Sequence, residues 1–575
     1  MDQHLKIRPY TAWQLIRMYW ESEHRFFAYG LLAVVLFFTI ILVGFDVLFT
    51  TWYNYFYDAL QDYDVRATLQ LLAIFCFMAA VYIVLYVYRF YIQAYLGLKW
   101  RQWLTKEFLD RWLARRSYYH LESFDIQTDN PDQRIQEDIQ NLVLNSLNLI
   151  VGLVSSIVTI FAFVLVLWEL SGILTIPLGP LGTLHIPGYL VWVGMLYNIL
   201  GTWITFKLGR PLIMLNFEQQ RREANFRFAA IDVRSHSEHV ALYRGEDNEK
   251  NILQKIFSGV LDNWYAIIIR QKLLFWFTAS YNQIAVLVPL AVVLPNYFNK
   301  VFKLGGFVQS IAAFGKIQDA LSFLVNSYTT IAEWRATIRR LLTFLNHMYE
   351  LDVTVKQKNH IQFLPNPQNK IITKDLNIQT PKGLSLLKNI AEQFEHGKHY
   401  VIKGPSGVGK STFVRTLAGI WPFGQGEISL PDKKNIMFLP QTPYMPLGSL
   451  KDALLFPDKL VSVKNSDLEK LLDCCDLPHL KNRLLDVERW GELLSPGELQ
   501  RISVLRLLLH KPDWAFMDES TSSLDLAHEK QVFQLLKEKL PTCSVVSVGH
   551  RPSLDEYHDV EIDLSKYART SSNSR

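Results

Sequence analysis

The chain has 575 residues, a net charge of +5, and a hydrophobic share of 50%. This length exceeds one ordinary domain, and a mean hydropathy of +0.08 is too apolar for a soluble protein with evenly spread apolar residues. Lys and Arg are scattered, which excludes the basic stripe typical of nucleic-acid binding. The apolar residues must therefore be concentrated in part of the chain, and we expect no nucleic-acid partner.

The cysteines form no disulfide framework. Cys76 lies in an apolar run, and Cys474, Cys475 and Cys543 lie in the C-terminal half. We therefore expect a reduced, cytosolic C-terminal half. The first apolar run begins near Phe26 and is long enough to stay in a membrane, so we expect no cleaved signal peptide.

Six apolar stretches in the N-terminal part are long enough to span a membrane. They cover residues 26–49, 69–96, 142–167, 189–206, 267–293 and 307–331. Lys and Arg gather at one end of these stretches, as with Lys99, Arg101, Lys207 and Arg210, and are rare at the other. The positive-inside rule places that end, with both termini, in the cytoplasm. We expect an all-α membrane domain of six helices over residues 1–345.

Charged, helix-favouring segments separate the second span from the third and the fourth from the fifth, so we expect the membrane helices to continue into the cytoplasm. The sixth span is unusually polar, with Gln309, Lys316, Gln318 and Asp319. A charge at mid-bilayer costs roughly 2.5 to 3.5 kcal/mol. Two interpretations stay open. Either these residues face a wet substrate path, or Lys316 and Asp319, three apart on one helix face, merely neutralise each other or already lie at the cytoplasmic end. Asp46 in the first span either shares that path or lies at the outer interface.

The composition changes after the membrane part. Residues 346–368 are polar and contain Pro365 and Pro367, which predicts a linker. We expect an α/β domain over residues 369–565, beginning with a strand over 371–378, and a disordered tail over residues 566–575.

A phosphate-binding loop dominates the second domain. Residues 404–412, Gly-Pro-Ser-Gly-Val-Gly-Lys-Ser-Thr, fit G-x-x-x-x-G-K-[ST] at every fixed position. A strand expected over 398–403 and a helix over 413–418 supply the required context, which a plain Gly-rich turn does not need. Lys410 would reach the β- and γ-phosphate oxygens of a nucleotide, and Ser411 would ligate Mg²⁺. The expected nucleotide-binding residues of this loop are Gly404, Ser406, Gly407, Gly409, Lys410, Ser411 and Thr412.

Two further motifs follow. An apolar strand ends in Asp518, which would hold Mg²⁺, and Glu519, which would polarise the attacking water. Upstream, Ser495, Pro496 and Glu498 form the capping box of a helix start with proline at its first position. Taken alone, the second motif is explained by a capped helix start.

The order of the motifs resembles the ATPase domain of an ABC transporter. After the phosphate loop come residues 439–441 (Leu-Pro-Gln), 494–498 (Leu-Ser-Pro-Gly-Glu), 517–519 (Met-Asp-Glu), 522–525 (Ser-Ser-Leu-Asp) and 548–550 (Val-Gly-His). The resemblance implies that Gln441 senses Mg²⁺ and the lytic water, so that it joins Ser411 and Asp518 as a metal ligand. It also implies that His550 contacts the γ-phosphate.

The same resemblance implies that two chains pair. Ser495, Gly497 and Glu498 would contact the γ-phosphate side of an ATP held by the other subunit, at a helix N-terminus suited to anions. Asp525 would belong to the loop that crosses the dimer. Because one chain carries one set of motifs, we expect a homodimer.

Two positions depart from the family pattern. The signature L-S-G-G-Q has Pro496 and Glu498 in place of a glycine and the glutamine, and we expect hydrolysis to survive. Thr380 stands where an aromatic residue usually stacks on adenine. The lost stack would weaken nucleotide binding by about 1 to 3 kcal/mol and leaves the preference for ATP over GTP open.

Four segments of the membrane half resemble one subgroup, the SbmA/BacA-like transporters and the peroxisomal fatty-acyl (subfamily D) transporters. They are residues 54–61, 99–105, 129–135 and 243–246. The resemblance implies an exporter-type fold in the bacterial inner membrane that uses ATP and Mg²⁺. We expect import of peptide-like or cobalamin-like cargo. The alternatives are export or flipping of fatty-acyl compounds, and a membrane-anchored regulatory ATPase, which the polar sixth span disfavours.

Overall fold

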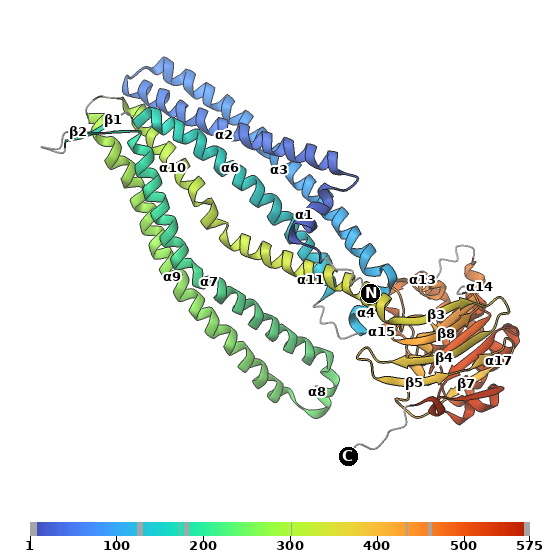
Figure 1. Cartoon of the computed structure of the whole chain (residues 1–575). Helices are drawn as coiled ribbons and strands as arrows, with labels where there is room; N and C mark the ends of the chain where they lie inside the picture. The colour runs from blue at the N-terminus through green and yellow to red at the C-terminus, as the bar shows by residue number, and fades with distance from the viewer. Residues whose placement is uncertain are drawn as a thin grey trace, which may run out of the picture. The chain divides into compact units, whose positions relative to one another are not determined.

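The computed structural model describes residues 9–123, 130–171, 173–177, 183–298, 300, 302–432, 435–457 and 463–568. They form two compact units (Figure 1). The first unit comprises residues 1–113 and 128–347, and the second comprises residues 114–127 and 348–575. The second unit thus includes a short segment that precedes the third predicted membrane span.

The first unit is helical. Its helices are α1 (Ala12–Trp20), α2 (Arg25–Gln61), α3 (Val65–Leu113), α5 (Pro131–Gln133), α6 (Ile139–Ser171), α7 (Tyr189–Ser235), α8 (Ser237–Tyr243), α9 (Glu246–Phe298), α10 (Leu304–Asn326) and α11 (Tyr328–Lys358), which ends in the second unit. A short hairpin, β1 (Ile173–Pro177) and β2 (Thr183–Pro187), joins α6 to α7. Helix α2 packs on α3, α7 on α9, and α10 on both α2 and α6.

Several of these helices are much longer than a membrane is thick. Helix α9 has 53 residues and is therefore about 80 Å long, whereas the hydrocarbon core measures about 30 Å. Helices α3 and α7 have 49 and 47 residues. The predicted continuation of the apolar spans into long polar helices is confirmed.

Five helices of the described residues are long and apolar enough to cross a membrane, and they coincide with the first five predicted spans. The sixth span, predicted over residues 307–331, is not confirmed by this criterion. It falls on α10 and the start of α11, which are separate helices that meet near Ser327. The polar residues Gln309, Lys316, Gln318 and Asp319 interrupt the apolar sequence of α10, which does not meet the criterion that the other five helices meet.

The second unit is α/β. Its helices are α4 (Ser117–Ser123), α12 (Lys410–Leu417), α13 (Leu450–Leu455), α14 (Asn465–Cys474), α15 (Trp490–Leu493), α16 (Pro496–His510) and α17 (Leu526–Lys539). Its strands are β3 (Asn359–Pro365), β4 (Ile371–Gln379), β5 (Ser385–Ile390), β6 (Gln393–Phe394), β7 (Tyr400–Lys403), β8 (Gly424–Leu430), β9 (Ile436–Leu439), β10 (Gly448–Ser449), β11 (Val487–Glu488), β12 (Trp514–Asp518), β13 (Ser544–Val548) and β14 (Val560–Asp563).

Two sheets organise this unit. One has the order β14-β7-β13-β12-β9, with every neighbouring pair parallel. The other has the order β3-β8-β4-β5, with β6 paired to β4. Because the strands of the first sheet are parallel, the loops after them emerge at a single edge.

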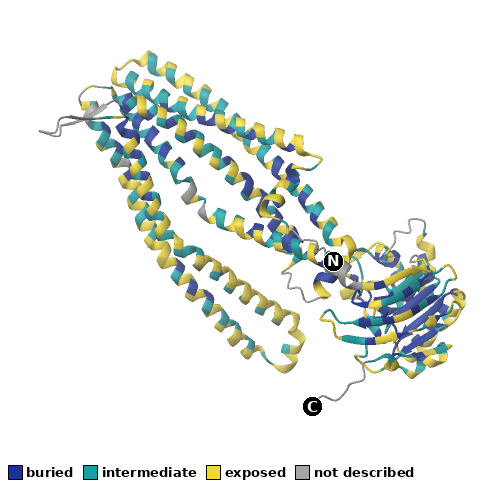
Figure 2. Ribbon diagram, viewed as in Figure 1, coloured by how far each residue is buried: buried dark blue, intermediate teal, exposed yellow. Residues whose placement is uncertain are grey.

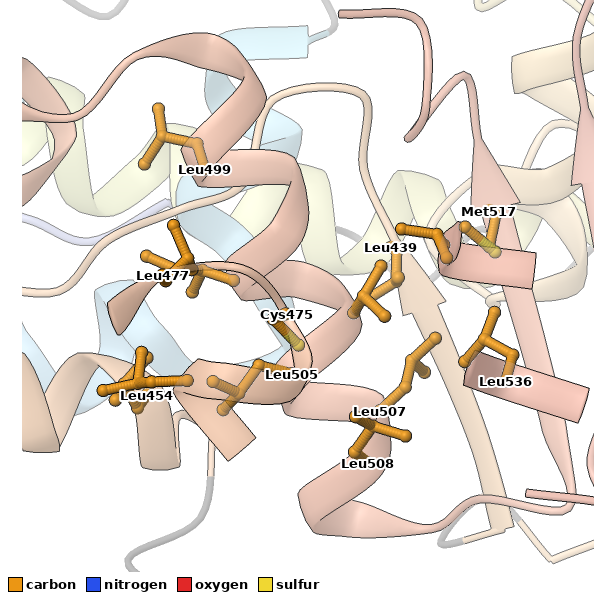
Figure 3. Close-up of a cluster of buried hydrophobic side chains, with 14 of the residues drawn as sticks. Leu439, Leu454, Cys475, Leu477, Leu499, Leu505, Leu507, Leu508, Met517 and Leu536 are labelled. Atoms are coloured by element: carbon orange, nitrogen blue, oxygen red, sulfur yellow. The ribbon is translucent and has the colours of Figure 1, made fainter. Parts of the chain in front are cut away.

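Apolar side chains are buried on both sides of the parallel sheet. Figure 2 shows its strands mostly as buried, whereas the long helices of the first unit expose many residues. One cluster joins the sheet to α16 and α17, and Figure 3 shows part of it, including Leu505, Leu508, Met517 and Leu536. This packing fixes α16 relative to the strand that ends at Asp518.

The region predicted to be a linker is largely regular structure. Over residues 346–368, α11 continues to Lys358, and β3 then pairs with β8. The paired backbone of β3 and the buried side chain of Ile361 explain why this polar stretch is ordered. Of the predicted tail, residues 566–568 belong to the fold, since Ala568 bridges to Leu387, and residues 569–575 lie outside the described part.

Candidate functional site

Four neighbouring strands bring the predicted catalytic residues to one edge of the parallel sheet. The phosphate loop follows β7, and His550 follows β13. Asp518 is the last residue of β12, Glu519 comes directly after it, and Gln441 follows β9. Ligands of open parallel sheets bind at this carboxyl edge. Lys410 and His550, which are 140 positions apart in the chain, therefore meet in one place.

The phosphate loop has the conformation that its glycines allow. Gly404, Gly407 and Gly409 have φ values of 144°, 80° and 109°, which residues with a Cβ rarely adopt. Helix α12 begins directly afterwards, so its free N–H groups face the loop. This arrangement can hold phosphate oxygens.

Lys410 is buried within the loop. Its Nζ donates hydrogen bonds to the carbonyl oxygens of Gly404 (2.8 Å) and Pro405 (3.1 Å), and it lies 2.8 Å from His550 Nε2. Burial lowers the pKa of Lys410, while Glu519 and Asp518 oppose that effect. Phosphate oxygens can replace the carbonyl groups as acceptors for this ammonium group.

The two carboxylates have different neighbours. Ser411 Oγ donates to Asp518 Oδ1 at 3.1 Å, and Gln441 Nε2 donates to Glu519 Oε2 at 3.0 Å. Burial raises the pKa of Asp518, which the hydrogen bond from Ser411 partly offsets. Glu519 has a left-handed φ of 51°, a strained conformation for a residue with a Cβ, and strain of this kind is concentrated at functional sites.

A cleft of about 550 Å³ lies beside these groups. It is lined by Ser411, Arg415, Gln441 and Asp518. Hydroxyl, carboxylate and amide oxygens suit Mg²⁺, which keeps several waters and binds through few protein ligands plus substrate phosphates. The described residues contain no cluster of three or more His, Cys, Asp or Glu that could hold a metal alone. The donor set therefore fits Mg²⁺ bound together with a nucleotide.

The predicted signature motif forms a helix start, as the sequence indicates. Ser495 caps α16, with its N and Oγ donating to Glu498 Oε2 at 2.8 and 2.7 Å. His479 Nε2 lies 2.9 Å from the other oxygen, Glu498 Oε1. Burial alone would raise the pKa of Glu498, but the hydrogen bonds from Ser495 and the nearby cations hold it below its usual range.

Gly497 and Asp525 lie close to the same loop. A Cβ on Gly497 would be 3.5 Å from Ser523 O, and Asp525 caps α17 by accepting the His528 N–H at 2.8 Å. Within the described chain, no hydrogen bond joins Ser495, Gly497 or Asp525 to the phosphate loop. The structure thus places the predicted site residues in two sets, one around Lys410 and one at the start of α16.

Gln500 connects the two sets, and sequence reasoning did not identify it. Its side chain is buried, with Nε2 3.4 Å from Glu519 O and 3.3 Å from Ser522 Oγ, while Oε1 accepts the Ser523 N–H at 2.9 Å. Arg551 also holds this loop through Ser522 O at 2.6 Å. Helix α16 also carries Arg501, Ser503 and Arg506, so a glutamine among these polar residues is not a distinctive signal in the sequence.

Thr380, the residue at the usual adenine-stacking position, closes a turn. Its Oγ1 accepts the Leu384 N–H at 3.0 Å, and its N donates to Leu384 O at 2.7 Å. The hydroxyl is thus engaged locally, and its short side chain offers no ring for stacking.

The polar residues of α10 contact α2. Lys316 Nζ pairs with Asp46 Oδ1 at 2.7 Å, and Asn54 Nδ2 donates to Gln309 Oε1 at 2.7 Å. Lys316 therefore has an ion pair with Asp46 on α2, a partner that neither interpretation of the sequence named. A line of polar contacts runs between two helices of the membrane region.

The segment 54–61 at the end of α2 also holds the start of α10. Asp58 Oδ1 accepts the Gly305 N–H at 2.7 Å, and Gln61 Oε1 accepts the Leu304 N–H at 2.8 Å. These two side chains satisfy N–H groups that a helix start leaves free. The carboxylate of Asp58 also places a negative charge near the positive end of the helix dipole of α10.

Known proteins share both halves of this chain. Residues 15–298 match the family described as ABC transporter transmembrane region 2, and residues 387–522 match the family described as ABC transporter. An uncharacterized ABC transporter ATP-binding protein of Haemophilus influenzae is 35% identical, over 95% of this chain and 92% of its own length.

Two further relatives are similar over almost the same extent. The inner membrane ABC transporter ATP-binding protein YddA of Escherichia coli is 32% identical over 96% of each chain. ABC transporter D family member 2, chloroplastic, of Arabidopsis thaliana is 31% identical over 95% of this chain and 85% of its own length. These matches confirm the resemblance to the group that includes subfamily D. The chain belongs to the ABC transporter family, as a membrane region fused to an ATPase domain, and it couples ATP hydrolysis to transport.

Proposed function

We propose that two copies of the chain bind ATP between them, with the phosphate loop of one copy facing the Ser495–Gly497 turn of the other. The observation that carries this proposal is the division of the motif residues into two sets: among the described residues, no hydrogen bond joins Ser495, Gly497 or Asp525 to the phosphate loop. Each set has a helix N-terminus suited to phosphate, at α12 and at α16. A single copy would leave the second helix start without a phosphate to bind.

In this arrangement Lys410 and the loop N–H groups bind the phosphates, and Ser411, Asp518 and Gln441 hold Mg²⁺. When bound, Mg²⁺ neutralises charge on the phosphate oxygens. Glu519 accepts a proton from the attacking water, which Gln441 positions through its contact with the same carboxylate. The water oxygen bonds to the γ-phosphorus as the bond to ADP breaks. His550 donates to the departing phosphate.

For the membrane region we propose that α10 is a sixth span and that the cargo is hydrophilic, peptide-like or cobalamin-like, and imported. The support is the polar contact line between α2 and α10, formed by Asp46 with Lys316 and Asn54 with Gln309. Polar groups at membrane depth are costly unless they face each other or water, so they mark solute paths. Closure of two ATPase domains around ATP would switch the side from which this path opens.

Placement in a bacterial inner membrane, with both termini in the cytoplasm, completes the proposal. It rests on the distribution of Lys and Arg and on the similarity to an inner membrane protein of Escherichia coli. A fatty-acyl or lipid-like cargo is the second candidate, because the relative from Arabidopsis belongs to the D family.

Uptake of a labelled cationic peptide tests the proposal. Cells without a peptide importer would express the wild type, Glu519→Gln, or Glu538→Gln, which changes an exposed glutamate of α17. Accumulation by the wild type and Glu538→Gln, but not by Glu519→Gln, supports import driven by ATP hydrolysis. If none accumulates the peptide while fatty-acyl compounds stimulate the ATPase activity of the purified protein, the second candidate replaces the first.

A further inference from the structure

His528, on the first turn of α17, lies between two carboxylates. Its Nδ1 is 2.9 Å from both oxygens of Asp525, and its Nε2 is 3.3 Å from Asp476 Oδ2. Asp476 follows α14, so the imidazole ring bridges the start of one helix and the end of another. The ring is about one-third exposed and can exchange protons with water.

Both ring nitrogens therefore face carboxylate oxygens. A neutral imidazole has one N–H group, so one of its nitrogens would point a lone pair at a carboxylate. Only the protonated ring donates to both carboxylates. The geometry requires the imidazolium form for the bridge to be complete.

The other groups around the ring define its electrostatic setting. Arg501 of α16 donates to the same Asp476 oxygen at 2.9 Å, and Cys474 of α14 lines the same small cavity as Arg501 and the ring. Glu529, the neighbouring acid on α17, is bonded to Thr521 and Ser553. Of the two carboxylates in contact with the ring, Asp476 thus also pairs with a permanent cation, Arg501.

The bridge ends at two parts of the candidate dimer site. On one side, Asp525 belongs to the loop that the family resemblance places across the dimer. On the other side, Arg501 lies three residues after Glu498, on the same face of α16, and Glu498 holds Ser495. The chain of contacts from Asp525 through the ring, Asp476 and Arg501 thus connects both surfaces that would meet the partner's ATP.

We propose that His528 is a positioning residue of the ATP site formed between two copies, and that its imidazolium form holds Asp525 in register with the signature helix. The proposal rests on the proposed dimeric site. Protonation keeps the two surfaces together and favours ATP-bound closure. Loss of the proton at higher pH releases Asp525 from Asp476 and weakens closure without altering the residues around Lys410.

The test measures ATP binding as well as turnover. In the Glu519→Gln background, ATP-dependent dimer formation and nucleotide affinity would be compared at about pH 6 and about pH 8.5, on either side of the range in which histidines change charge. The protein that keeps His528 should bind ATP about threefold more weakly at the higher pH. This change in affinity is on the scale of a partly exposed ion pair. The His528→Gln protein should bind ATP weakly at both pH values. The His528→Lys protein, which keeps a positive charge, should bind ATP tightly at both.

Two controls make the result specific. Asp476→Asn, combined with His528→Gln, should add little to either single change, because both remove the same bridge. His396→Gln, an exposed histidine elsewhere in the domain, should keep the wild-type response to pH. In turnover assays, the His528→Gln protein should differ from the wild type in the KM for ATP, with kcat little changed.

The outcomes separate this proposal from the proposed function. If His528→Gln keeps the wild-type pH response of ATP affinity, the positioning role of His528 is overturned while the dimeric site stands. If the Glu519→Gln protein forms no ATP-dependent dimer even at about pH 6, the proposed dimeric site fails, and the role of His528 fails with it.

Discussion

Gly305 at the start of α10 lies directly against the backbone of α2 at Asn54. A Cβ on Gly305 would be 1.9 Å from Asn54 O and 2.6 Å from Asp58 Oδ1. The neighbour is backbone, so a side chain here requires one helix to move. This close approach allows Asp58 and Gln61 to reach the first N–H groups of α10.

Gly305→Ala should therefore destabilise the membrane region. Overpacking of this kind costs about 1 to 3 kcal/mol, and it would also lengthen the capping hydrogen bond from Gly305 N to Asp58. The measurement is the thermal midpoint of the purified protein in detergent. Gly315→Ala is the matched control, because a Cβ on that glycine of α10 meets nothing within 4 Å. An equal loss in both variants would contradict the specific contact at Asn54.

The local structure around the predicted ATPase residues could be predicted from the sequence, because its determinants are local. The phosphate loop, the capping box of Ser495 and Glu498, and the strand ending at Asp518 each lie within a few residues of one another. The two sets of residues around Lys410 and Ser495 could be assigned, but not placed, from the motifs. Their positions depend on the strand order of the parallel sheet, which connects residues far apart in the chain.

The membrane region was less predictable, for a physical reason. Periodicity tells which residues share a helix face but not which helix lies opposite. The sequence could therefore offer Asp319 only as one possible neighbour of Lys316, and the partner in the structure is Asp46 on another helix. The segment 54–61 could be matched only by resemblance, since its role as a cap for α10 depends on tertiary packing.

The pair of Asp46 and Lys316 should stabilise the contact between α2 and α10. Their side chains are 22% and 39% exposed, so the pair is partly shielded from water. Lys316→Met leaves Asp46 without its cation, and we expect a loss of about 1 to 2 kcal/mol, less than for a fully buried pair. The measurement is again the thermal midpoint in detergent.

A double-mutant cycle with Asp46→Asn tests that explanation. Asp46→Asn with Lys316→Met should be more stable than Lys316→Met alone, because no unpaired charge remains. Asp62→Asn, which breaks a more exposed pair with Lys303 at the end of the same two helices, should change the midpoint little. Additive losses at Asp46 and Lys316 would argue against the pairing.

Acidification should destabilise the ATPase domain through His399. Its Nδ1 accepts the Val545 N–H at 3.1 Å, and burial lowers its pKa, with Asp559 opposing and Lys537 adding to the effect. Because the pKa of His399 is lower in the folded domain, the unfolded chain takes up a proton at a higher pH than the folded domain does as the pH falls. Stability is therefore retained above the ordinary histidine pKa of about 6.5 and is lost as the pH falls below it.

Thermal unfolding of the domain between about pH 7 and about pH 5 measures this dependence. His399→Gln should unfold more easily at neutral pH and lose less stability on acidification than the wild type. His558 is a second, partly buried histidine whose pKa is lowered by desolvation, so part of the dependence should remain. An unchanged pH dependence in His399→Gln would exclude this residue as its source.

An aromatic ring at position 380 should strengthen nucleotide binding. Thr380 has no ring to stack on a base, and stacking contributes about 1 to 3 kcal/mol per base, so Thr380→Tyr should tighten ATP binding by about tenfold. The KM for ATP and for GTP would both fall, since every base has a face on which to stack. Thr380→Val is the control, because it removes the hydroxyl that accepts the Leu384 N–H without supplying a ring. If Thr380→Tyr and Thr380→Val bind ATP equally, the base does not lie over this turn, and the site must hold it through other residues.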